Sequence, residues 1–558
     1  MAIKAKRPSA TPFRRRLTER WGPKGPYVLL ALVGYIPMLL TKPGVVSADT
    51  KVYLYLDPGR LLHSAVSMWD PDVAMGTVTH QTIGYLFPMG PFFWLTHALA
   101  IPTWVAQRLW LGTLLFMAGA GVVYLLRTLR WRGPGVAVAG FVYLLSPYIL
   151  NYAAKHSVIA LPWVGLPWLL AFTIRSARHG GWRDPALFAL WVALIGGVNA
   201  TALAFALVGA LLWLPFAVWV HREMSWRQAG AALGRMASLT IFTSTWWLAG
   251  LWAQGRYGIN VLQYTETAKT VASASTAPEV LRGLGYWFFY GKDKFGNFVD
   301  MGVPYTQHLW LLATSFALPT LAILGGALAR FRERAYFVTL VVVGTLLSVG
   351  AFPWDGSTVV PRVLRGFLTS SQAGSAMRSM PRAVPLLVLG LAVLLGAGVT
   401  ALHQRLSERT NRLDRRVLAV SGGLVLLALV NFGPGLTGGA VAGGLDRPGP
   451  PPDYWKNDAK ALDAQSHSTR VLEMPGSDFA SYRWYGDLAT TVDPITPGLI
   501  TRPSVAREAV PYGTPQSANM LIAFDTRLQE DLLSPNAIAP MARLMSAGDL
   551  NLRNDLTY

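Results

Sequence analysis

Long apolar runs recur along the whole chain, and they constrain its fold more than any other feature. Each run is close to the roughly 20 residues that an α-helix needs to cross a bilayer. Only 14% of the residues are charged, whereas soluble proteins carry roughly a quarter. The sequence therefore predicts an α-helical polytopic membrane protein with about eleven transmembrane helices. The runs lie at about 27–46, 104–126, 136–150, 158–174, 185–198, 200–220, 236–253, 308–328, 336–352, 384–402 and 417–436.

The loops between the runs alternate in charge. Five are rich in arginine: 127–132, 175–183, 221–235, 330–334 and 403–416. All five fall where a cytoplasmic N-terminus requires an inner loop, and the basic N-terminal arm is expected to stay inside as well. The opposite loops and the C-terminal tail are then exterior. Membrane topology thus accounts for the net charge of +20, and nucleic-acid binding is not expected.

Two of the runs admit a second interpretation. The first ends in Val46-Ser47-Ala48, which resembles a signal-peptidase site, but its length and the long basic arm before it favour a retained helix. The runs at 185–198 and 200–220 are separated only by Gly196-Gly-Val-Asn199. They are either two spans or one kinked, re-entrant hairpin.

The composition changes after residue 437. Gly and Pro dominate a linker at 438–453, and the residues beyond it resemble a soluble domain with helices at 454–465 and 516–533 and a strand from Arg470. The predicted organisation is a basic cytoplasmic arm (1–26), a transmembrane domain (27–437), the linker (438–453) and a small mixed α/β exterior domain (454–558). That domain is expected to be incomplete and to pack over the exterior loops 47–103 and 254–306.

Carboxylates and aromatic rings concentrate in the first exterior loop, 47–103. A carboxylate just outside a membrane helix suits a reaction on a lipid-linked sugar. Transfer from a polyprenyl phosphate needs a base for the acceptor hydroxyl but no general acid, because phosphate leaves without being protonated. Asp49 is the predicted general base and Asp57 the alternative. Asp49 could instead pair with Lys51, and Asp57 could shape the turn before Pro58.

Metal chemistry has weaker support. Asp70-Pro71-Asp72 could hold a divalent cation through its carboxylates, but Asp-Pro is also a common turn. Catalysis is therefore predicted without an obligatory metal or other cofactor, with a divalent cation at Asp70 and Asp72 as the alternative. The chain has no cysteine, which excludes disulfides, thiol catalysis and thiolate metal sites. It contains no P-loop, no His-Glu-x-x-His and no Gly-x-Gly-x-x-Gly before a helix.

Exterior cations and aromatic residues are the candidates for substrate binding. Four are predicted to hold the donor phosphate: Lys155, His156, Arg378 and Arg382. Arg378 and Arg382 would share a face if their segment is helical, and Arg108 belongs to a wider set of exterior cations. Six are predicted to contact sugars: Trp69, His80, Gln81, Tyr85, Trp484 and Tyr485. Lipid-headgroup pairing for the cations, and core packing for the rings, are the structural alternatives.

Several long strings carry a resemblance to a known family. They are Ala48-Asp-Thr-Lys-Val-Tyr-Leu-Tyr-Leu-Asp-Pro-Gly-Arg60, Trp69-Asp-Pro-Asp-Val-Ala-Met-Gly-Thr-Val-Thr-His-Gln81 and Gly84-Tyr-Leu-Phe-Pro-Met-Gly-Pro91, extended by Val105-Ala-Gln-Arg-Leu-Trp-Leu-Gly112 and Ser146-Pro-Tyr-Ile-Leu-Asn151. These strings resemble the mycobacterial α-(1→3)-arabinofuranosyltransferases, the AftD family. The resemblance implies a GT-C-type fold with its catalytic carboxylate in the first exterior loop.

The resemblance also implies a reaction. The expected donor is decaprenyl-phosphoryl arabinose and the expected acceptor is the arabinan of arabinogalactan or lipoarabinomannan, on the outer face of the plasma membrane. Family members are longer, so a truncated version or a divided gene is expected. An acyl carrier protein is an implied cytoplasmic partner. The chain is thus predicted to be an inverting arabinofuranosyltransferase. The alternative is a polyprenyl-linked sugar flippase or a non-catalytic cell-wall assembly protein.

Overall fold

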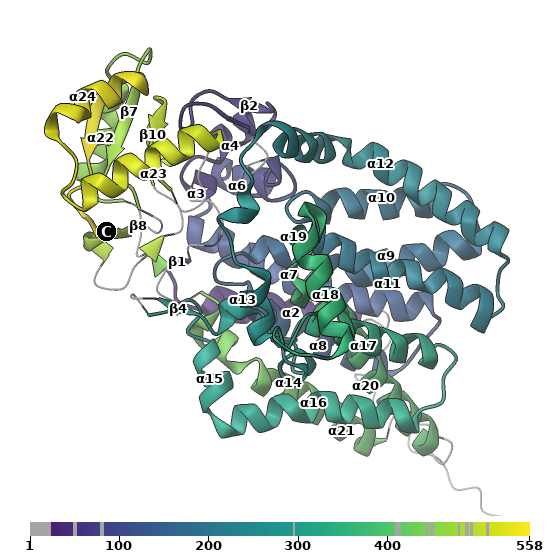
Figure 1. Ribbon diagram of the computed structural model, residues 1–558. Helices are drawn as coiled ribbons and strands as arrows, with labels where there is room; N and C mark the ends of the chain where they lie inside the picture. The colour runs from purple at the N-terminus through teal and green to yellow at the C-terminus, as the bar shows by residue number, and fades with distance from the viewer. Residues whose placement is uncertain are drawn as a thin grey trace, which may run out of the picture.

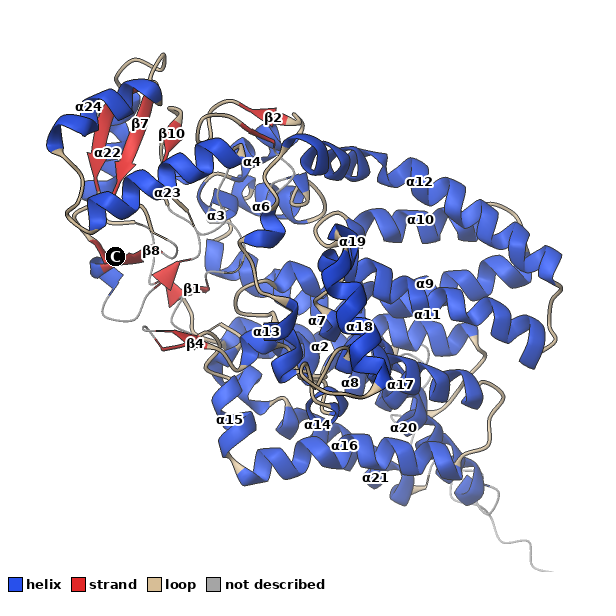
Figure 2. Cartoon of the chain, viewed as in Figure 1, coloured by secondary structure: helices blue, strands red, loops and turns tan. Residues whose placement is uncertain are grey.

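Helices dominate the protein, and the strands gather around the first exterior loop and the C-terminal residues (Figures 1 and 2). The computed structural model describes residues 24–47, 49, 53–78, 83–293, 296–407, 414–441, 446–447, 451–477, 480–485, 490–491, 495–508 and 513–557.

Each predicted apolar run forms a helix. In chain order they are α2 (Gly25–Leu40), α7 (Thr103–Thr128), α8 (Pro134–Leu144), α9 (Leu161–His179), α10 (Arg183–Gly196), α11 (Ala200–Pro215), α12 (Trp226–Tyr257), α16 (Leu309–Leu328), α17 (Arg334–Val349), α20 (Val384–Ser407) and α21 (Arg415–Asn431). Among the described residues, seven helical segments have the length and apolar composition to cross a membrane. The chain is therefore a multi-pass membrane protein. The figure of eleven spans stays a prediction, since α2 and α17 are apolar but shorter, and α10 and α12 are not among the seven segments.

The most buried helices form the centre of the helical body. About nine-tenths of the apolar windows of segments Ser157–His179 and Met380–Leu406 are buried, against 28% for Arg415–Gly439. Glycines let the central helices approach closely. A Cβ added at Gly135 of α8 would lie 2.1 Å from the carbonyl oxygen of Gly396 in α20, and one at Gly396 would lie 2.5 Å from that of Gly135. Small residues of this kind allow backbone contact between membrane helices, which dispersion then stabilises.

The segment 185–220 forms two helices. Asn199 ends the break between α10 and α11, because its side-chain oxygen accepts a hydrogen bond from the Ala202 N–H at 2.8 Å and so caps α11. Asparagine is among the best residues for this position. Of the two helices, only the segment Ala200–Val220 is among the seven that could cross a membrane. That the pair forms two spans and not a re-entrant hairpin stays a prediction.

Shorter elements connect the long helices on the predicted exterior side. The first loop holds β1 (Val46–Ser47), α3 (Tyr53–Leu56), α4 (Pro58–Ala65), β2 (Trp69–Asp70), β3 (Thr77–Val78) and α6 (Met89–Ala98). The later loops hold the 3-10 helices η1 (Pro147–Asn151), η2 (Ser157–Ala160), η5 (Trp287–Phe289) and η6 (Met380–Ala383), with α13 (Ala268–Ala274), α14 (Ala277–Leu281), α15 (Gly302–Gln307), α18 (Val359–Ser370) and α19 (Gln372–Ala376).

The C-terminal residues combine helices with two small sheets. Their elements are β6 (Asp446–Arg447), α22 (Asp453–Asp463), β7 (Arg470–Met474), β8 (Ala480–Tyr482), β9 (Thr490–Thr491), β10 (Ser504–Val505), α23 (Pro515–Gln529), α24 (Pro535–Leu544), β11 (Ala547–Leu552) and β12 (Leu556–Thr557). One sheet is parallel in the order β10-β7-β11, and the other is antiparallel in the order β12-β8-β9. Helices α22 and α23 and strand β7 lie where the sequence predicted them.

The C-terminal residues pack against the first exterior loop (Figure 1). The Ala74 N–H donates to the Ser504 carbonyl at 2.9 Å, and the Ser504 N–H donates to the Asp72 carbonyl at 3.0 Å. The Arg470 guanidinium donates to the Ala74 carbonyl at 2.8 Å, and β1 pairs with β6. The prediction that the tail covers loop 47–103 is confirmed. That it also covers loop 254–306 stays a prediction.

Candidate active site

Two side chains from the first turns of α7 fix the strand that leads to Asp49. Gln107 donates to the Ser47 carbonyl at 2.9 Å and accepts from the Ser47 N–H at 3.0 Å. Arg108 is fully buried and donates to the carbonyls of Thr41 at 3.2 Å and Val45 at 2.7 Å. The prediction that Arg108 is an exterior cation available to a phosphate is wrong. Its guanidinium instead satisfies the carbonyls beyond the end of α2.

Asp49 is itself buried and held by Ser157. One carboxylate oxygen accepts the Ser157 N–H at 2.7 Å, and the other accepts the Ser157 hydroxyl. The Trp110 indole donates to that same hydroxyl oxygen at 2.8 Å, which fixes the serine rotamer. Burial raises the pKa of Asp49 from 3.8 to about 7, although both bonds from Ser157 lower it. A carboxylate with a pKa near neutrality can both accept and release a proton at physiological pH.

Lys155 and His156 immediately precede Ser157 and face an aromatic pair. Lys155 is only 4% exposed. Its ammonium lies 5.2 Å from the ring centroid of Phe288 and 5.7 Å from that of Phe298. The His156 ring meets Phe288 edge-on at 5.7 Å. A desolvated cation over aromatic faces is attracted by their quadrupoles. Ser157, which holds Asp49, therefore lies in the same short stretch of chain as these two predicted phosphate residues.

Arg378 and Arg382 contact different partners. Arg378 donates to the Glu266 carbonyl at 2.6 Å, and its guanidinium lies 3.7 Å from the Glu266 carboxylate. Arg382 donates to the Asn199 side chain at 3.3 Å. They do not share one α-helical face, because α19 ends at Ala376 and a 3-10 turn, η6, begins only at Met380. Pro381 follows in that turn, and it biases the preceding residue away from the α-helical conformation.

An aromatic cluster joins Arg382 to the Asp49 side of the site. The Tyr286 ring lies 5.0 Å from that of Tyr152 and 6.4 Å from that of Phe288. Burial, with the nearby Glu266 charge, raises the pKa of Tyr286 to about 12, although Arg382 lowers it through its charge and a hydrogen bond. Arg382 thus meets one end of the cluster, while Lys155 and His156 meet the other at Phe288. Residues from three distant loops converge here.

The remaining carboxylates of the first loop have local roles. Asp57 caps α4 by accepting from the Arg60 N–H at 3.0 Å. Asp70 accepts from the Asp72 N–H at 2.9 Å in the turn between β2 and β3. Both geometries match the turn interpretations. Within the part of the chain that the structure describes, no group of three or more His, Asp and Glu side chains could hold a metal ion. Metal independence stays a prediction.

The predicted sugar-contacting residues are spread over the exterior side. Trp69 is 49% exposed on β2, and Tyr85 packs half-buried against the helical core. Trp484 stacks on Tyr482 at 5.4 Å, in a cluster of the tail that also touches α3, which fits the packing alternative. His80, Gln81 and the side chain of Tyr485 lie outside the described residues. All six stay predictions.

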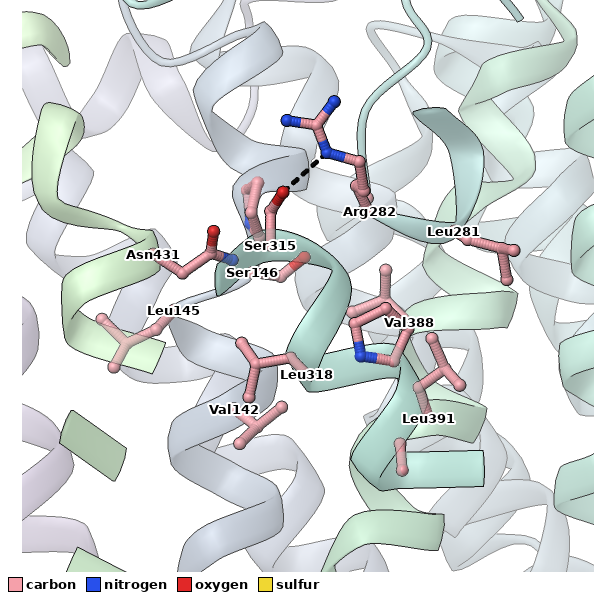
Figure 3. Close-up of a pocket in the computed structure, with 14 residues that line it drawn as sticks. Val142, Leu145, Ser146, Leu281, Arg282, Ser315, Leu318, Val388, Leu391 and Asn431 are labelled. Atoms are coloured by element: carbon pink, nitrogen blue, oxygen red, sulfur yellow. Dashed lines mark hydrogen bonds between the residues drawn. The ribbon is translucent and has the colours of Figure 1, made fainter. Parts of the chain in front are cut away.

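A small cavity lies among α8, α16 and α20 and is bounded at one end by residues 281–283 (Figure 3). Its volume is about 40 Å³, room for a few water molecules but not for a sugar. Arg282 at its polar end donates to the Ser315 hydroxyl at 2.7 Å, which is the dashed line in Figure 3, and to Glu279 at 2.6 Å. The cavity is therefore not a substrate site. Its arginine ties loop 254–306 to α16.

Sequence reasoning missed the residues that hold the site together. These are Gln107, Trp110, Ser157, Glu266 and Tyr286. Gln107 and Trp110 do lie in one of the strings shared with the family, and Ser157 directly follows Lys155 and His156. No sequence pattern placed Glu266 or Tyr286 near Arg378 and Arg382, because the contacts join loops that are about a hundred residues apart.

Comparisons with known proteins agree with this architecture. The family model for the N-terminal GT-C domain of α-(1→3)-arabinofuranosyltransferase matches residues 33–558. The chain is 30% identical over 517 residues to the α-(1→3)-arabinofuranosyltransferase of Mycobacterium tuberculosis, covering 88% of this chain and 35% of that protein. It is 29% identical over 538 residues to the enzyme of the same name from Mycolicibacterium smegmatis, covering 92% and 36%.

A solved structure shows the same fold. The cryo-EM structure of arabinofuranosyltransferase AftD from mycobacteria has a TM-score of 0.74 and 24% identity to this chain, and the match covers 97% of this chain and 35% of that one. The chain thus spans about a third of the length of the relatives that it matches. With the family model matched over nearly its whole length, the chain belongs to the AftD family of α-(1→3)-arabinofuranosyltransferases, as the part that corresponds to their N-terminal GT-C domain.

Proposed function

We propose that this chain transfers arabinofuranose from a decaprenyl-phosphoryl donor to an arabinan acceptor, with inversion and with Asp49 as the general base. The observation that carries the proposal is the placement of Asp49. It is a buried carboxylate with a pKa of about 7, fixed by Ser157, which directly follows two predicted phosphate-binding residues. The names of the relatives agree with the reaction class.

The reaction balances with one base. An acceptor hydroxyl oxygen attacks the anomeric carbon of the donor, and the bond from that carbon to the phosphate oxygen breaks. The phosphate keeps the electron pair, and Asp49 takes the hydroxyl proton as the new glycosidic bond forms. Decaprenyl phosphate is released as a dianion, and Asp49 later returns its proton to water. Attack from the face opposite the phosphate inverts the configuration.

The cations around the aromatic cluster suit the departing phosphate. Lys155 lies over the Phe288 ring of this cluster, and Arg382 forms a hydrogen bond with Tyr286. Arg378 pairs with Glu266 close to Tyr286. Cationic partners stabilise the charge that develops on a leaving phosphate, so no divalent cation is required. The partly exposed ring of Phe288 offers a surface on which the donor sugar or prenyl chain can lie, beside the buried Tyr286.

The proposal includes a topology. Eleven spans, a cytoplasmic N-terminus and an exterior tail place Asp49 on the outer face of the membrane, as the arginine-rich loops indicate. The transmembrane domain then covers 27–437, and 454–558 forms an exterior domain against the first loop. The arabinan of arabinogalactan or lipoarabinomannan is the acceptor that this side would meet. An acyl carrier protein on the inner face is a further proposed partner.

Product analysis tests the reaction class. The purified chain would be reconstituted in liposomes with labelled decaprenyl-phosphoryl arabinose and an arabinan oligosaccharide. Release of decaprenyl phosphate together with a new arabinofuranosyl linkage is the expected result. Movement of the lipid between leaflets without a new bond would identify a flippase instead. Neither bond formation nor lipid movement would favour an assembly role.

A further inference from the structure

Two adjoining pockets lie at the arginine-rich ends of the central helices, away from the Asp49 site. The larger, of about 950 Å³, is lined by Pro26, by Arg127 at the end of α7, by residues 130–133 and by Val136 of α8. The smaller, of about 320 Å³, lies between Arg130–Arg132 and Arg330, with Ala397 and Thr400 contributed by α20. Trp131 lines both pockets, and its ring packs edge-on against Phe331 at 5.1 Å.

Four arginines line the pockets from two separate segments, and one of them, Arg127, lies over the Tyr27 ring at 4.9 Å. The other three have no such partner among the described residues. Arg130, Arg132 and Arg330 are exposed. Within the described part of the chain none of their guanidinium groups forms an ion pair or hydrogen bond, unlike Arg178 and Arg332, which pair with Glu223. Positive-inside topology accounts for arginines in these loops. It does not account for their convergence on one pair of cavities.

Arg130 occupies a position that favours glycine. Its φ is +65°, at the point where α7 ends and the Trp131 N–H turns back to the Leu126 carbonyl at 2.8 Å. Helices commonly end on glycine in this conformation because other residues are strained there. The turn brings Arg130, Trp131 and Arg132 together, and all three line both pockets.

The surfaces beside the pockets identify the kind of ligand. Leu328, at the end of α16 and next to pocket-lining Ala329, is 69% exposed, and Leu324 is 51% exposed. On the other side, Leu29 of α2 is 53% exposed close to pocket-lining Pro26. Apolar side chains this exposed on membrane helices face acyl chains. The pockets therefore join a cationic cavity to a lipid-facing wall.

We propose that these pockets bind the headgroup of an anionic phospholipid, with Arg130, Arg132 and Arg330 around its phosphate and its acyl chains along α16 and α2. Basic pockets between helix ends on the cytoplasmic side of membrane proteins recognise such headgroups. Arginine suits phosphate because its planar fork can donate two parallel hydrogen bonds. Trp131 provides the amphipathic ring expected at this depth.

Lipid titration of the full chain tests the proposal. The protein would be placed in phosphatidylcholine nanodiscs with rising fractions of phosphatidylglycerol, and its thermal unfolding midpoint and bound phosphatidylglycerol, counted by native mass spectrometry, would be followed. We expect saturable binding. Each single variant should weaken binding about fivefold, because an arginine near an anionic headgroup contributes about 1 kcal/mol, which is about fivefold in affinity. The Arg130→Gln/Arg330→Gln variant should weaken it about 30-fold.

A matched control distinguishes lipid binding at these pockets from nonspecific attraction of anionic lipid to a positively charged protein. Arg227 is exposed at the start of α12, also in a predicted inner loop, and lines neither pocket. Arg227→Gln removes the same charge and should leave the titration unchanged. If the double variant does not fold, the single variants give the same comparison. An equal response of all variants would overturn the proposal. Saturation of the wild-type site by inorganic phosphate alone would also overturn it, because the ligand would then be soluble.

Discussion

Replacing Asp49 by asparagine should change how the stability of the protein depends on pH. The native pKa of about 7 exceeds the ordinary 3.8 because the charged form is buried. A difference of about 3 in pKa corresponds to about 4 kcal/mol. A raised carboxyl pKa contributes stability that is fully present below pH 4, and the wild type loses it as the pH rises to about 7. The asparagine side chain cannot ionise, so the Asp49→Asn variant keeps its stability over this range.

The effect is measurable in thermal unfolding. Between pH 5 and the pKa of about 7, the free energy of unfolding of the wild type should fall by about 2.7 kcal/mol, at about 1.4 kcal/mol per pH unit. Above pH 7 it should fall no further on this account. With the unfolding entropy expected for a chain of this size, this loss lowers the wild-type unfolding midpoint by roughly 2–3 °C relative to that of the variant. The midpoint of the variant minus that of the wild type should therefore increase up to about pH 7 and stay constant above it. Asparagine can still accept the Ser157 N–H, so packing is preserved.

Asp57→Asn is the matched control. Asp57 caps α4, and asparagine caps helices about as well as aspartate. Its midpoint should follow that of the wild type at every pH. A pH-independent difference between Asp49→Asn and the wild type would refute the raised pKa, and with it the physical basis for Asp49 as a base.

Four further predictions concern the site, the metal and the topology. Ser157→Ala removes a hydrogen bond that lowers the pKa of Asp49, so the pH of half-maximal kcat/KM should rise, while Ser157→Thr should restore it. Arg382→Gln removes a cation from the proposed phosphate site and should raise KM for the lipid donor roughly tenfold. A chelator should leave the rate of the wild type unchanged, because no metal ion is proposed to take part. Because the chain has no cysteine, Ser370→Cys should react with an impermeant maleimide from outside, and Arg132→Cys only after permeabilisation.

Much of the helical architecture could be predicted because membrane helices must satisfy their own backbone groups. Each apolar run therefore had to be a helix, and each is. Their packing could not be predicted: the approach of Gly135 to Gly396 depends on a pairing of helices that hydropathy does not encode. Arg108 shows the same limit. Its position suggested an exterior cation, but the fold turns its side chain inward to the carbonyls that follow α2.

The sequence singled out Asp49 as a candidate, but it did not indicate which residues surround Asp49 in the fold. The role of Asp49 as the base stays a prediction. Asp49 follows directly after the first run and lies in a string shared with the family, so chain position alone singled it out. Its partner Ser157 is 108 residues away, and a lone serine carries no local signal. The convergence of Lys155 and Arg382 on the Tyr286 cluster depends equally on tertiary contacts.

The rate of transfer in the Asp49→Asn variant tests the central claim most directly. Purified wild type and variant would be mixed at pH 8 with labelled decaprenyl-phosphoryl arabinose and arabinan acceptor, and the new linkage would be followed in a single turnover. Loss of a general base should slow the variant by roughly 10²–10⁴-fold, while donor binding and the folded state stay intact. A variant that transfers at the wild-type rate, with Asp57→Asn inactive instead, would show that Asp57 is the base.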